Sequence, residues 1–365
     1  MITNFKINID NIKLGSMPFL NSEKESNIER EINILLTPDN NYVIHCSVVM
    51  ASVLMNCDKT SNINFYITDG GLSKENKSYL KDINKIRNCN VYFLDITKYN
   101  FSNLPLNRPH IKVPSTYFRL LVCEILPKDI EKILYLDCDV IVEQDLKELW
   151  DIKIDKYLAG VVEDETAISN SARLGINFYF NSGVILFNIT ELRKFNLYKK
   201  CINYFNKNKG LILLQDQDIL NGVLNNKCLK LPLNWNVSNP IFKNNSVWKQ
   251  QASFHEKIKA QIEPKIIHYT YIPKPWNKNC NHPLRDEYFK YLKIINPNYY
   301  KKIYRYKKLS EFIFQYLKND THSIIIIMGI KFKIKRKNNF RILKDELESI
   351  QYELMDMKQK IQELK

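Results

Sequence analysis

Short apolar runs and longer stretches with apolar residues at helical spacing alternate along the chain from residue 32 onward. Runs of four to eight apolar residues predict buried strands, whereas apolar residues three and four apart predict helices. The predicted strands are 32–36, 63–67, 91–94, 133–142, 158–162, 178–188 and 265–269. The predicted helices are 43–55, a helix capped by Ser73, 115–126, 191–208 and a helix beginning at 214. Strands that alternate with helices predict an α/β domain with a mostly parallel central sheet.

Two carboxylates interrupt the predicted strand 133–142, with Cys138 between Asp137 and Asp139. The apolar residues before them are typical of a sheet covered on both faces, where an aspartate is disfavoured unless its burial is compensated. Both carboxylates can turn to one side of a tight loop and supply oxygen ligands to Mg²⁺ or Mn²⁺. Such a metal would hold a diphosphate. The alternative is an ordinary strand end capped by aspartate in a turn.

Other polar residues fall where the predicted parallel strands end, namely Thr37, Asp39 and Asp69, as Asp137 and Asp139 do. Ligands of such sheets bind outside the carboxyl ends of the strands, so we expect these residues to line a site. Asparagine and glycine inside the predicted strand 178–188, at 181–183, indicate a bulge or a close approach of a ligand.

The chain resembles glycosyltransferase family 8 through an ordered set of motifs between residues 32 and 276. These are Thr37-Pro-Asp39-Asn-Asn-Tyr42, Tyr-Phe-Arg119-Leu, Leu-Tyr-Leu-Asp137-Cys-Asp139, Tyr-Phe-Asn181-Ser-Gly183, Gln215-Asp216-Gln217-Asp218, and His268-Tyr followed by Lys274-Pro-Trp276. The resemblance implies a Rossmann-like nucleotide-diphosphosugar transferase fold of GT-A type, Mn²⁺ or Mg²⁺, a UDP-sugar donor and transfer that retains the anomeric configuration.

The resemblance also implies roles for individual residues. The metal ligands are expected to be Asp137, Asp139 and His268. Two carboxylates and an imidazole suit Mn²⁺; without the motifs, His268 would be read as a core histidine and Lys274 as a solvated loop lysine. The expected donor-site residues are Thr37, Asp39, Tyr42, Arg119, Cys138, Asp164, Asn181, Ser182, Gln217 and Lys274, with Glu163 as the alternative to Asp164. Asn40 stands where close relatives often carry a second aspartate.

The expected catalytic residues are Gln217, Asp216, Lys274 and Arg119. Transfer requires that the leaving diphosphate be stabilised while positive charge develops at the anomeric carbon, and the metal and Lys274 would supply this. The amide of Gln217 is a poor nucleophile. We therefore expect attack on the same face as the leaving group, with a donor phosphate oxygen taking the acceptor's proton and Gln217 stabilising charge.

The positive charge is concentrated near the C-terminus, where residues 301–341 hold twelve basic and two acidic residues and so contribute +10 of the chain's net +15. The eight cysteines lack metal-type spacing and are expected to be reduced, as in the cytosol. The N-terminal residues do not have the pattern of a secretory signal, and no apolar run approaches the about 20 residues that span a bilayer.

An isoleucine run at 324–327 precedes the lysine cluster of 331–337. This combination predicts binding to an anionic membrane surface, the alternative being a β-hairpin or a packed strand. The last segment carries apolar residues at alternating spacings of four and three: Leu343, Leu347, Ile350, Leu354, Met357, Ile361 and Leu364. This predicts self-association through a short coiled coil, the alternative being an amphipathic helix packed on its own domain.

We therefore expect an N-terminal extension (1–30), a catalytic domain (31–300), a membrane-associating segment (301–341) and a coiled-coil helix (342–365). The expected activity moves galactose or glucose from UDP-galactose or UDP-glucose to a cell-envelope saccharide such as lipopolysaccharide, in the cytoplasm at the inner face of the cytoplasmic membrane. A catalytically inactive relative and a basic nucleic-acid-binding protein are the alternatives. Because the excess charge is confined to a tail beside an isoleucine run, we expect no nucleic-acid partner.

Overall fold

The computed structural model describes residues 30–106, 114–242 and 252–304, and the backbone of 314–318, 322–327 and 330–335. The chain divides into two compact units, Met1–Thr270 and Tyr271–Lys365. Residues 1–29 of the predicted N-terminal extension and the whole predicted coiled coil lie outside the described residues, whereas Arg30 already belongs to the first strand.

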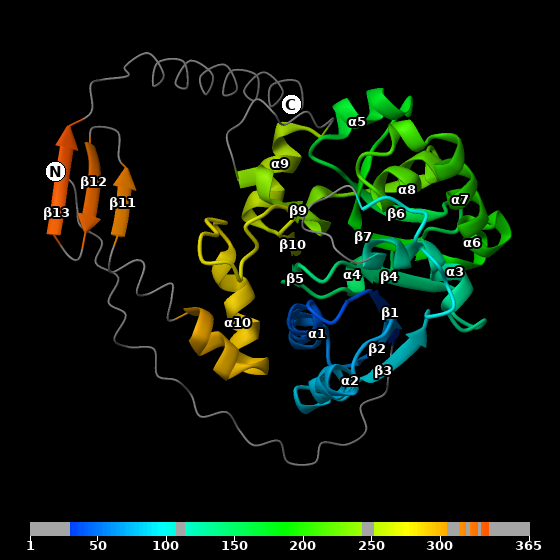
Figure 1. The fold of residues 1–365 in the computed structure, drawn as a ribbon, viewed down its shortest axis with the longest axis horizontal. Helices are drawn as coiled ribbons and strands as arrows, with labels where there is room; N and C mark the ends of the chain where they lie inside the picture. The colour runs from blue at the N-terminus through cyan, green and yellow to red at the C-terminus, as the bar shows by residue number, and fades with distance from the viewer. Residues whose placement is uncertain are drawn as a thin grey trace, which may run out of the picture. The chain divides into compact units, whose positions relative to one another are not determined.

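A seven-stranded sheet forms the centre of the first unit, in the order β3-β2-β1-β4-β7-β6-β8 (Figure 1). Its strands are β1 (Arg30–Leu36), β2 (Ser61–Asp69), β3 (Asn90–Asp95), β4 (Lys132–Leu136), β6 (Ala159–Glu163), β7 (Phe180–Asn188) and β8 (Cys228–Leu231). Only β7 runs antiparallel to its two neighbours, and the remaining pairs are parallel. The prediction of an α/β fold with a mostly parallel sheet is confirmed.

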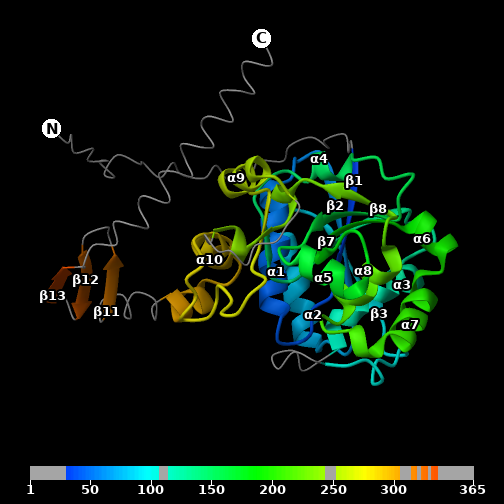
Figure 2. The same ribbon diagram turned by 90° about the horizontal axis from the view of Figure 1, so that it is seen from above.

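Helices cover both faces of this sheet. The α-helices of the first unit are α1 (Val43–Asn56), α2 (Lys74–Lys81), α3 (Val122–Ile125), α4 (Lys147–Trp150), α5 (Ala167–Leu174), α6 (Ile189–Phe195), α7 (Leu197–Lys207), α8 (Asp216–Leu224) and α9 (Phe254–Ile262). The 3₁₀-helices are η2 (Asp82–Lys85), η3 (Pro114–Leu121), η4 (Lys209–Leu211), η5 (Leu233–Trp235) and η6 (Asn239–Phe242). Figure 2 shows α6, α7 and α8 together on one side of the sheet.

A large hydrophobic core lies between the sheet and the helices η3, α6, α7 and α8. Leu35 of β1 and Tyr135 of β4 point into it, whereas Ile34 and Leu134, which alternate with them, are buried on the opposite face. Burial on both faces explains why these strands are apolar runs rather than alternating patterns. The polar residues that follow them are therefore confined to the strand ends.

A second, three-stranded sheet in the order β5-β10-β9 supports the loop after β4. Its strands are β5 (Val140–Val142), β9 (Val237–Ser238) and β10 (Ile266–His268). The predicted single strand 133–142 is thus two strands in two sheets. The chain leaves the large sheet at Leu136 and enters the small one at Val140, because the two aspartates occupy the turn between them.

Two predicted helices differ in detail from the structure. Residues 115–126 form the 3₁₀-helix η3 followed by the single turn α3, so a continuous α-helix there was wrong. Residues 191–208 form two helices, because Asn196 adopts a left-handed conformation with φ of 56° between α6 and α7. Asparagine tolerates this conformation better than most residues.

Two local predictions are confirmed. Ser73 caps α2 by accepting a hydrogen bond from the backbone N–H of Asn76. The pairing of β6 with β7 shifts at the Asn-Ser-Gly motif, since Val161 pairs with Ile185 whereas Val162 pairs with Asn181. The bulge allows the backbone of β7 to carry polar residues within an otherwise apolar strand.

In the second unit, α10 (Arg285–Ile295) follows a proline-rich loop in which Trp276 packs against Tyr288. An antiparallel sheet is formed by β11 (Phe314–Lys318), β12 (His322–Ile327) and β13 (Ile330–Lys335). β12 and β13 pair antiparallel, as the hairpin alternative predicted, and membrane binding stays a prediction. No helix in the described parts of the chain is both long and apolar enough to cross a bilayer.

Candidate active site

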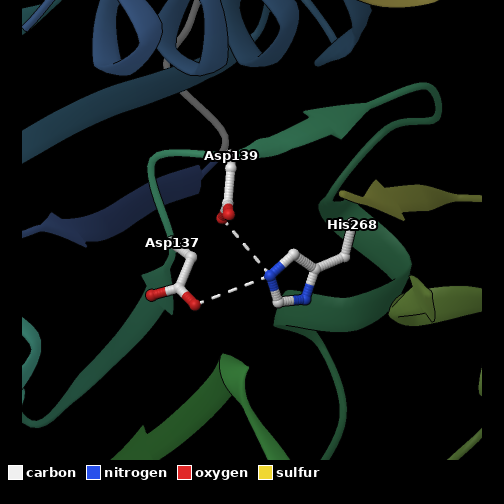
Figure 3. Close-up of side chains that lie close together, drawn as sticks. All are labelled: Asp137, Asp139 and His268. Carbon is white, nitrogen blue, oxygen red and sulfur yellow. Dashed lines mark ion pairs between the residues drawn. The ribbon is translucent and has the colours of Figure 1, made fainter. Parts of the chain in front are cut away.

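Asp137, Asp139 and His268 bring one ligand atom each within 4.8 Å of one another (Figure 3). The Nε2 atom of His268 lies 3.6 Å from Oδ2 of Asp137 and 3.3 Å from Oδ1 of Asp139. His268 is 3% exposed, so its imidazole is held by the protein rather than by solvent. Residues 131 positions apart in the sequence therefore form one cluster of potential metal ligands.

Backbone pairing between strands holds the three side chains together. His268 pairs with Val140 in the antiparallel β5–β10 ladder, and the N–H of Tyr269 donates to the carbonyl of Asp139 over 3.0 Å. On the other side, the N–H of Asp137 donates to the carbonyl of Gly183 over 2.8 Å. The loop between β4 and β5 is thus fixed at both ends, and the carboxylates need little rearrangement to bind a ligand.

Gly183 of β7 is required by the close approach of two of these residues. A Cβ atom at this position would lie 2.1 Å from Cε1 of His268 and 2.7 Å from Oδ2 of Asp137. Both distances are far below van der Waals contact. The glycine of the Asn-Ser-Gly motif therefore makes room for the metal-type cluster itself.

The two oxygens of Asp137 have different surroundings. Oδ1 accepts hydrogen bonds from Arg119 (Nη2, 2.7 Å) and from the hydroxyl of Tyr135 (2.6 Å), whereas Oδ2 faces His268. Burial raises the pKa of Tyr135 well above its ordinary value, so this hydroxyl keeps its proton and acts as a donor. The carboxylate is thereby oriented with one oxygen directed at the cluster.

Arg119 of η3 connects Asp137 to Asp216 at the start of α8. Its Nε lies 3.1 Å from Oδ2 of Asp216, its Nη1 donates to the carbonyl of Ser182 over 2.6 Å, and its guanidinium stacks on the ring of Tyr135. Burial alone would lower the pKa of Arg119, but the carboxylates of Asp137 and Asp216 outweigh it and raise the pKa above its ordinary value. Arg119 is therefore a permanent cation between the two carboxylates.

A second group of buried polar side chains lies around Asp164. Its Oδ2 accepts from Nδ2 of Asn181 (3.2 Å) and from Nε2 of Gln217 (3.1 Å), and Oε1 of Gln217 accepts from the N–H of Ser182 (3.1 Å). All four residues are at most 8% exposed. Glu163, the alternative at this position, instead accepts from the N–H of Ala252. The structure brings Asp164 rather than Glu163 into the group.

The residues that follow β1 form a third part of the site. The hydroxyl of Thr37 lies 3.0 Å from that of Tyr135, and Oδ1 of Asp39 accepts from the N–H groups of Asn41 and Tyr42. Burial raises the pKa of Tyr42, and the nearby charges of Asp139, Asp39 and Asp137 add to this. The phenol of Tyr42 therefore lies close to the carboxylate loop.

Two residues of this region are engaged within the fold. Asn40 bonds the carbonyl of Gly71, the N–H of Ser73 and the side chain of Asn76, and so ties the β1–α1 loop to the start of α2. The thiol of Cys138 shares a hydrogen bond with Cys46 of α1, and this bond and burial raise its pKa well above the ordinary value.

Lys274 lies in the second unit, where it is buried and its N–H donates to Oδ1 of Asn277 over 2.7 Å. Arg285 of α10 donates to the carbonyls of Pro275 and Asn277 and so fixes the same loop from the other side. The role expected for Lys274 stays a prediction.

Sequence reasoning missed several polar residues that hold the site. Asn236 bonds His268, and Tyr135 bonds Asp137. Asp218, which is fully buried, receives two bonds from Arg173 and one from the hydroxyl of Tyr179, which in turn accepts from Gln217. Burial alone would raise the pKa of Asp218, but these bonds and two backbone N–H groups keep it below its ordinary value. The sequence did contain an indication for Asp218, because a charged residue among the apolar positions of a helix needs a hydrogen-bonding or charged partner.

The donor set fits a divalent cation. Two carboxylate oxygens and an imidazole nitrogen converge, and the other nitrogen of His268 and the other oxygen of Asp137 are already hydrogen-bonded. Such outer bonds are the usual support of metal ligands. Oxygen with one imidazole suits Mn²⁺ or Mg²⁺ better than a thiophilic ion.

Known proteins resemble this chain over most of its length. The family described as "Glycosyl transferase family 8" matches residues 33–280. General stress protein A of Bacillus subtilis (strain 168) is 30% identical over 270 residues, which cover 72% of this chain and 93% of that protein. Lipopolysaccharide 1,2-glucosyltransferase of Escherichia coli (strain K12) is 27% identical over 286 residues, or 76% of this chain and 81% of that protein.

Solved structures agree with the sequence relatives. The galactosyltransferase LgtC, crystallised with donor and acceptor sugar analogues, superimposes with a TM-score of 0.67 at 25% identity, covering 74% of this chain and all of that one. The fold is therefore the GT-A type that the motifs implied. With the family match spanning more than half of the sequence and the polar residues gathered at the carboxyl ends of the strands, the chain is a glycosyltransferase that belongs to glycosyltransferase family 8.

Proposed function

We propose that this enzyme transfers a hexose, galactose or glucose, from a UDP-sugar to a cell-envelope saccharide such as lipopolysaccharide, with a divalent metal, Mn²⁺ or Mg²⁺, and with retention of anomeric configuration. The observation that carries the proposal is the cluster of Asp137, Asp139 and His268 beside the buried group around Asp164. Relatives named as lipopolysaccharide glucosyl- and galactosyltransferases support the choice of donor sugar and acceptor class.

When bound, the metal supplies positive charge to the leaving diphosphate. Asp137, Asp139 and His268 hold it, and Arg119 keeps one oxygen of Asp137 engaged so that the other faces the site. Lys274 contributes a second cation to the leaving group. Thr37, Asp39 and Tyr42 contact the uridine.

Asn181, Asp164 and Gln217 bind the transferred sugar. Gln217 is held at both ends of its amide, with Nε2 donating to Asp164 and Oε1 accepting from Ser182. A group held in this way stabilises charge without forming a bond to the sugar. The carboxylate of Asp216 is likewise held, by its ion pair with Arg119. This arrangement supports attack of the acceptor hydroxyl on the face that the diphosphate leaves, with a donor phosphate oxygen accepting the proton.

A direct test offers the purified enzyme UDP-galactose and UDP-glucose and measures UDP release with Mn²⁺ and with EDTA. We expect turnover of at least one donor, its loss in EDTA and its recovery when Mn²⁺ is added in excess. Full turnover in EDTA by protein that contains no metal would refute the metal dependence, and failure of both UDP-sugars would refute the proposed choice of donor. If the protein without substitutions is folded but turns over no donor, the alternative that it is a catalytically inactive relative is favoured.

We also propose that the C-terminal segment binds an anionic membrane surface and so places the enzyme at the inner face of the membrane. The support is compositional, since the isoleucine run and the lysines at 331, 333 and 335 are adjacent in sequence. Near anionic lipid each basic residue contributes about 1 kcal/mol. Removal of residues 301–365, a net charge of +8, is expected to abolish most flotation with anionic vesicles, while turnover on a soluble acceptor persists.

A full-length variant with glutamine at 331, 333 and 335 removes three positive charges and keeps the whole chain, so it distinguishes an effect of charge on flotation from an effect of truncation on folding. It should float less at low salt and depend less on added salt, because fewer charges remain for the salt to screen. A matched variant with glutamine at three exposed lysines of the first unit, Lys153, Lys199 and Lys207, should float as the unchanged protein does. Equal flotation of all forms would refute the membrane proposal.

A further inference from the structure

We propose that Asn236 is a positioning residue of the metal centre, which fixes the tautomer of His268 through a directed chain of hydrogen bonds that begins at Asp164. Only the expected effect on metal affinity rests on the proposed metal dependence. The tautomer of His268 is a property of the metal-free protein.

Asn236 lies beside His268 because of the small sheet. It follows η5 directly and precedes β9, whose Ser238 pairs with His268 in the parallel β9–β10 ladder. Its side chain is 5% exposed, and its Oδ1 lies 2.9 Å from Nδ1 of His268. Its Nδ2 donates to Oδ1 of Asn181 over 2.9 Å. Asn236 therefore joins the metal-type cluster to the residues around Asp164.

The direction of every bond in this chain follows from Asp164 and from the backbone N–H of Gly183, because the carboxylate accepts from amide NH₂ groups and a backbone N–H can only donate. Asn181 must present its NH₂ group to Asp164, which turns its Oδ1 toward Asn236 and the N–H of Gly183. Asn236 must then present its own NH₂ group to Asn181, so its Oδ1 faces His268. The hydrogen-bond partners of both amides therefore determine which end of each amide is the oxygen and which is the nitrogen, a distinction that the shape of an amide does not give.

The consequence is that the neutral imidazole of His268 has a single tautomer. Its Nδ1 carries the proton and donates to Asn236, so the lone pair of Nε2 is directed at Asp137 and Asp139. A metal ligand needs this free lone pair, and an outer hydrogen bond of this kind orients the ring and raises its basicity. Without Asn236, Nδ1 would lack its acceptor, and protonation at Nε2 with hydrogen bonds to the carboxylates would become favourable.

The first experiment needs no variant. Imidazole ¹⁵N spectra of metal-free, histidine-labelled protein distinguish Nδ1–H from Nε2–H, and the His268 signals are assigned by their loss in His268→Gln among the six histidines. We expect His268 to be the Nδ1–H tautomer. An Nε2–H tautomer in the unchanged protein would overturn the inference.

The second experiment measures Mn²⁺ affinity by the loss of the free Mn²⁺ signal in electron paramagnetic resonance. Asn236→Leu has a similar volume and no acceptor, and we expect its dissociation constant to rise by about 10- to 100-fold, the range found when outer partners of metal ligands are removed. Asn236→Asp keeps an acceptor for Nδ1–H but loses the donor to Asn181, and it should retain more of the affinity than Asn236→Leu. Comparison of the two variants distinguishes the loss of the hydrogen-bond acceptor from a disturbance of the fold.

Asn234 offers a matched control on the same turn. It is 4% exposed, and its Oδ1 has no hydrogen-bond partner among the described residues. Asn234→Leu should therefore leave Mn²⁺ affinity and the His268 spectrum unchanged. Equal affinity of Asn236→Leu and the unchanged protein would overturn the inference. If the unchanged protein binds no Mn²⁺, the proposed metal dependence fails, while the ¹⁵N spectrum still decides the tautomer.

Discussion

Asp137→Asn is expected to lower the rate of sugar transfer by about a thousandfold, equivalent to ~4 kcal/mol of transition-state stabilisation. Arg119 and Tyr135 both donate to Oδ1 of Asp137, so an asparagine keeps its oxygen there. Its NH₂ group then replaces Oδ2, the oxygen that faces His268. An amide NH₂ cannot bind a cation, and the variant loses a ligand while its hydrogen bonds persist. Steady-state kinetics with saturating Mn²⁺ measure the effect.

The matched control is Asp155→Asn, the same substitution at an exposed turn before β6, which should leave the rate unchanged. Thermal unfolding of both variants tests whether the fold is retained. A rate for Asp137→Asn within tenfold of the unchanged enzyme would mean that the metal, if present, binds elsewhere.

Gly183→Ala is expected to lower Mn²⁺ affinity and transfer together, by about a hundredfold in rate, since displacement of a reacting geometry by about 1 Å has effects of this size. The added methyl would lie 2.1 Å from Cε1 of His268 and 2.7 Å from Oδ2 of Asp137, so either the imidazole or the loop after β4 must move. Overpacking of this kind destabilises a fold by about 1–3 kcal/mol. Titration with Mn²⁺ and kinetics measure the two losses.

Gly210→Ala is its control, because a Cβ atom there meets nothing within 4 Å and the backbone is not in the left-handed region. It should behave as the unchanged enzyme in both measurements. Normal Mn²⁺ affinity in folded Gly183→Ala would show that the imidazole is not part of the metal centre.

Much of the fold was predictable because its central strands are buried on both faces. The strands β1, β4, β6 and β7 are apolar runs ended by polar residues, which identifies both the strand and the edge at which ligands bind. The edge strands β3 and β8 are partly exposed, and β8 was not predicted. The helices were less predictable. The 3₁₀ turns of η3 and the break at Asn196 depend on how these segments pack on the sheet, and their apolar spacing does not differ from that of an α-helix.

The sequence by itself determined that Asp137 and Asp139 stand at a strand end and that His268 and Gly183 belong to motifs of the same family. Only the tertiary structure decided how they meet, because the small sheet pairs β5 with β10, which lies more than 120 residues further along the chain. It also selected Asp164 over Glu163, since neighbouring residues at a strand end point in opposite directions. The role of Asn236 could not be inferred from the chain alone. An asparagine has no fixed chemistry until its neighbours define which end donates and which accepts.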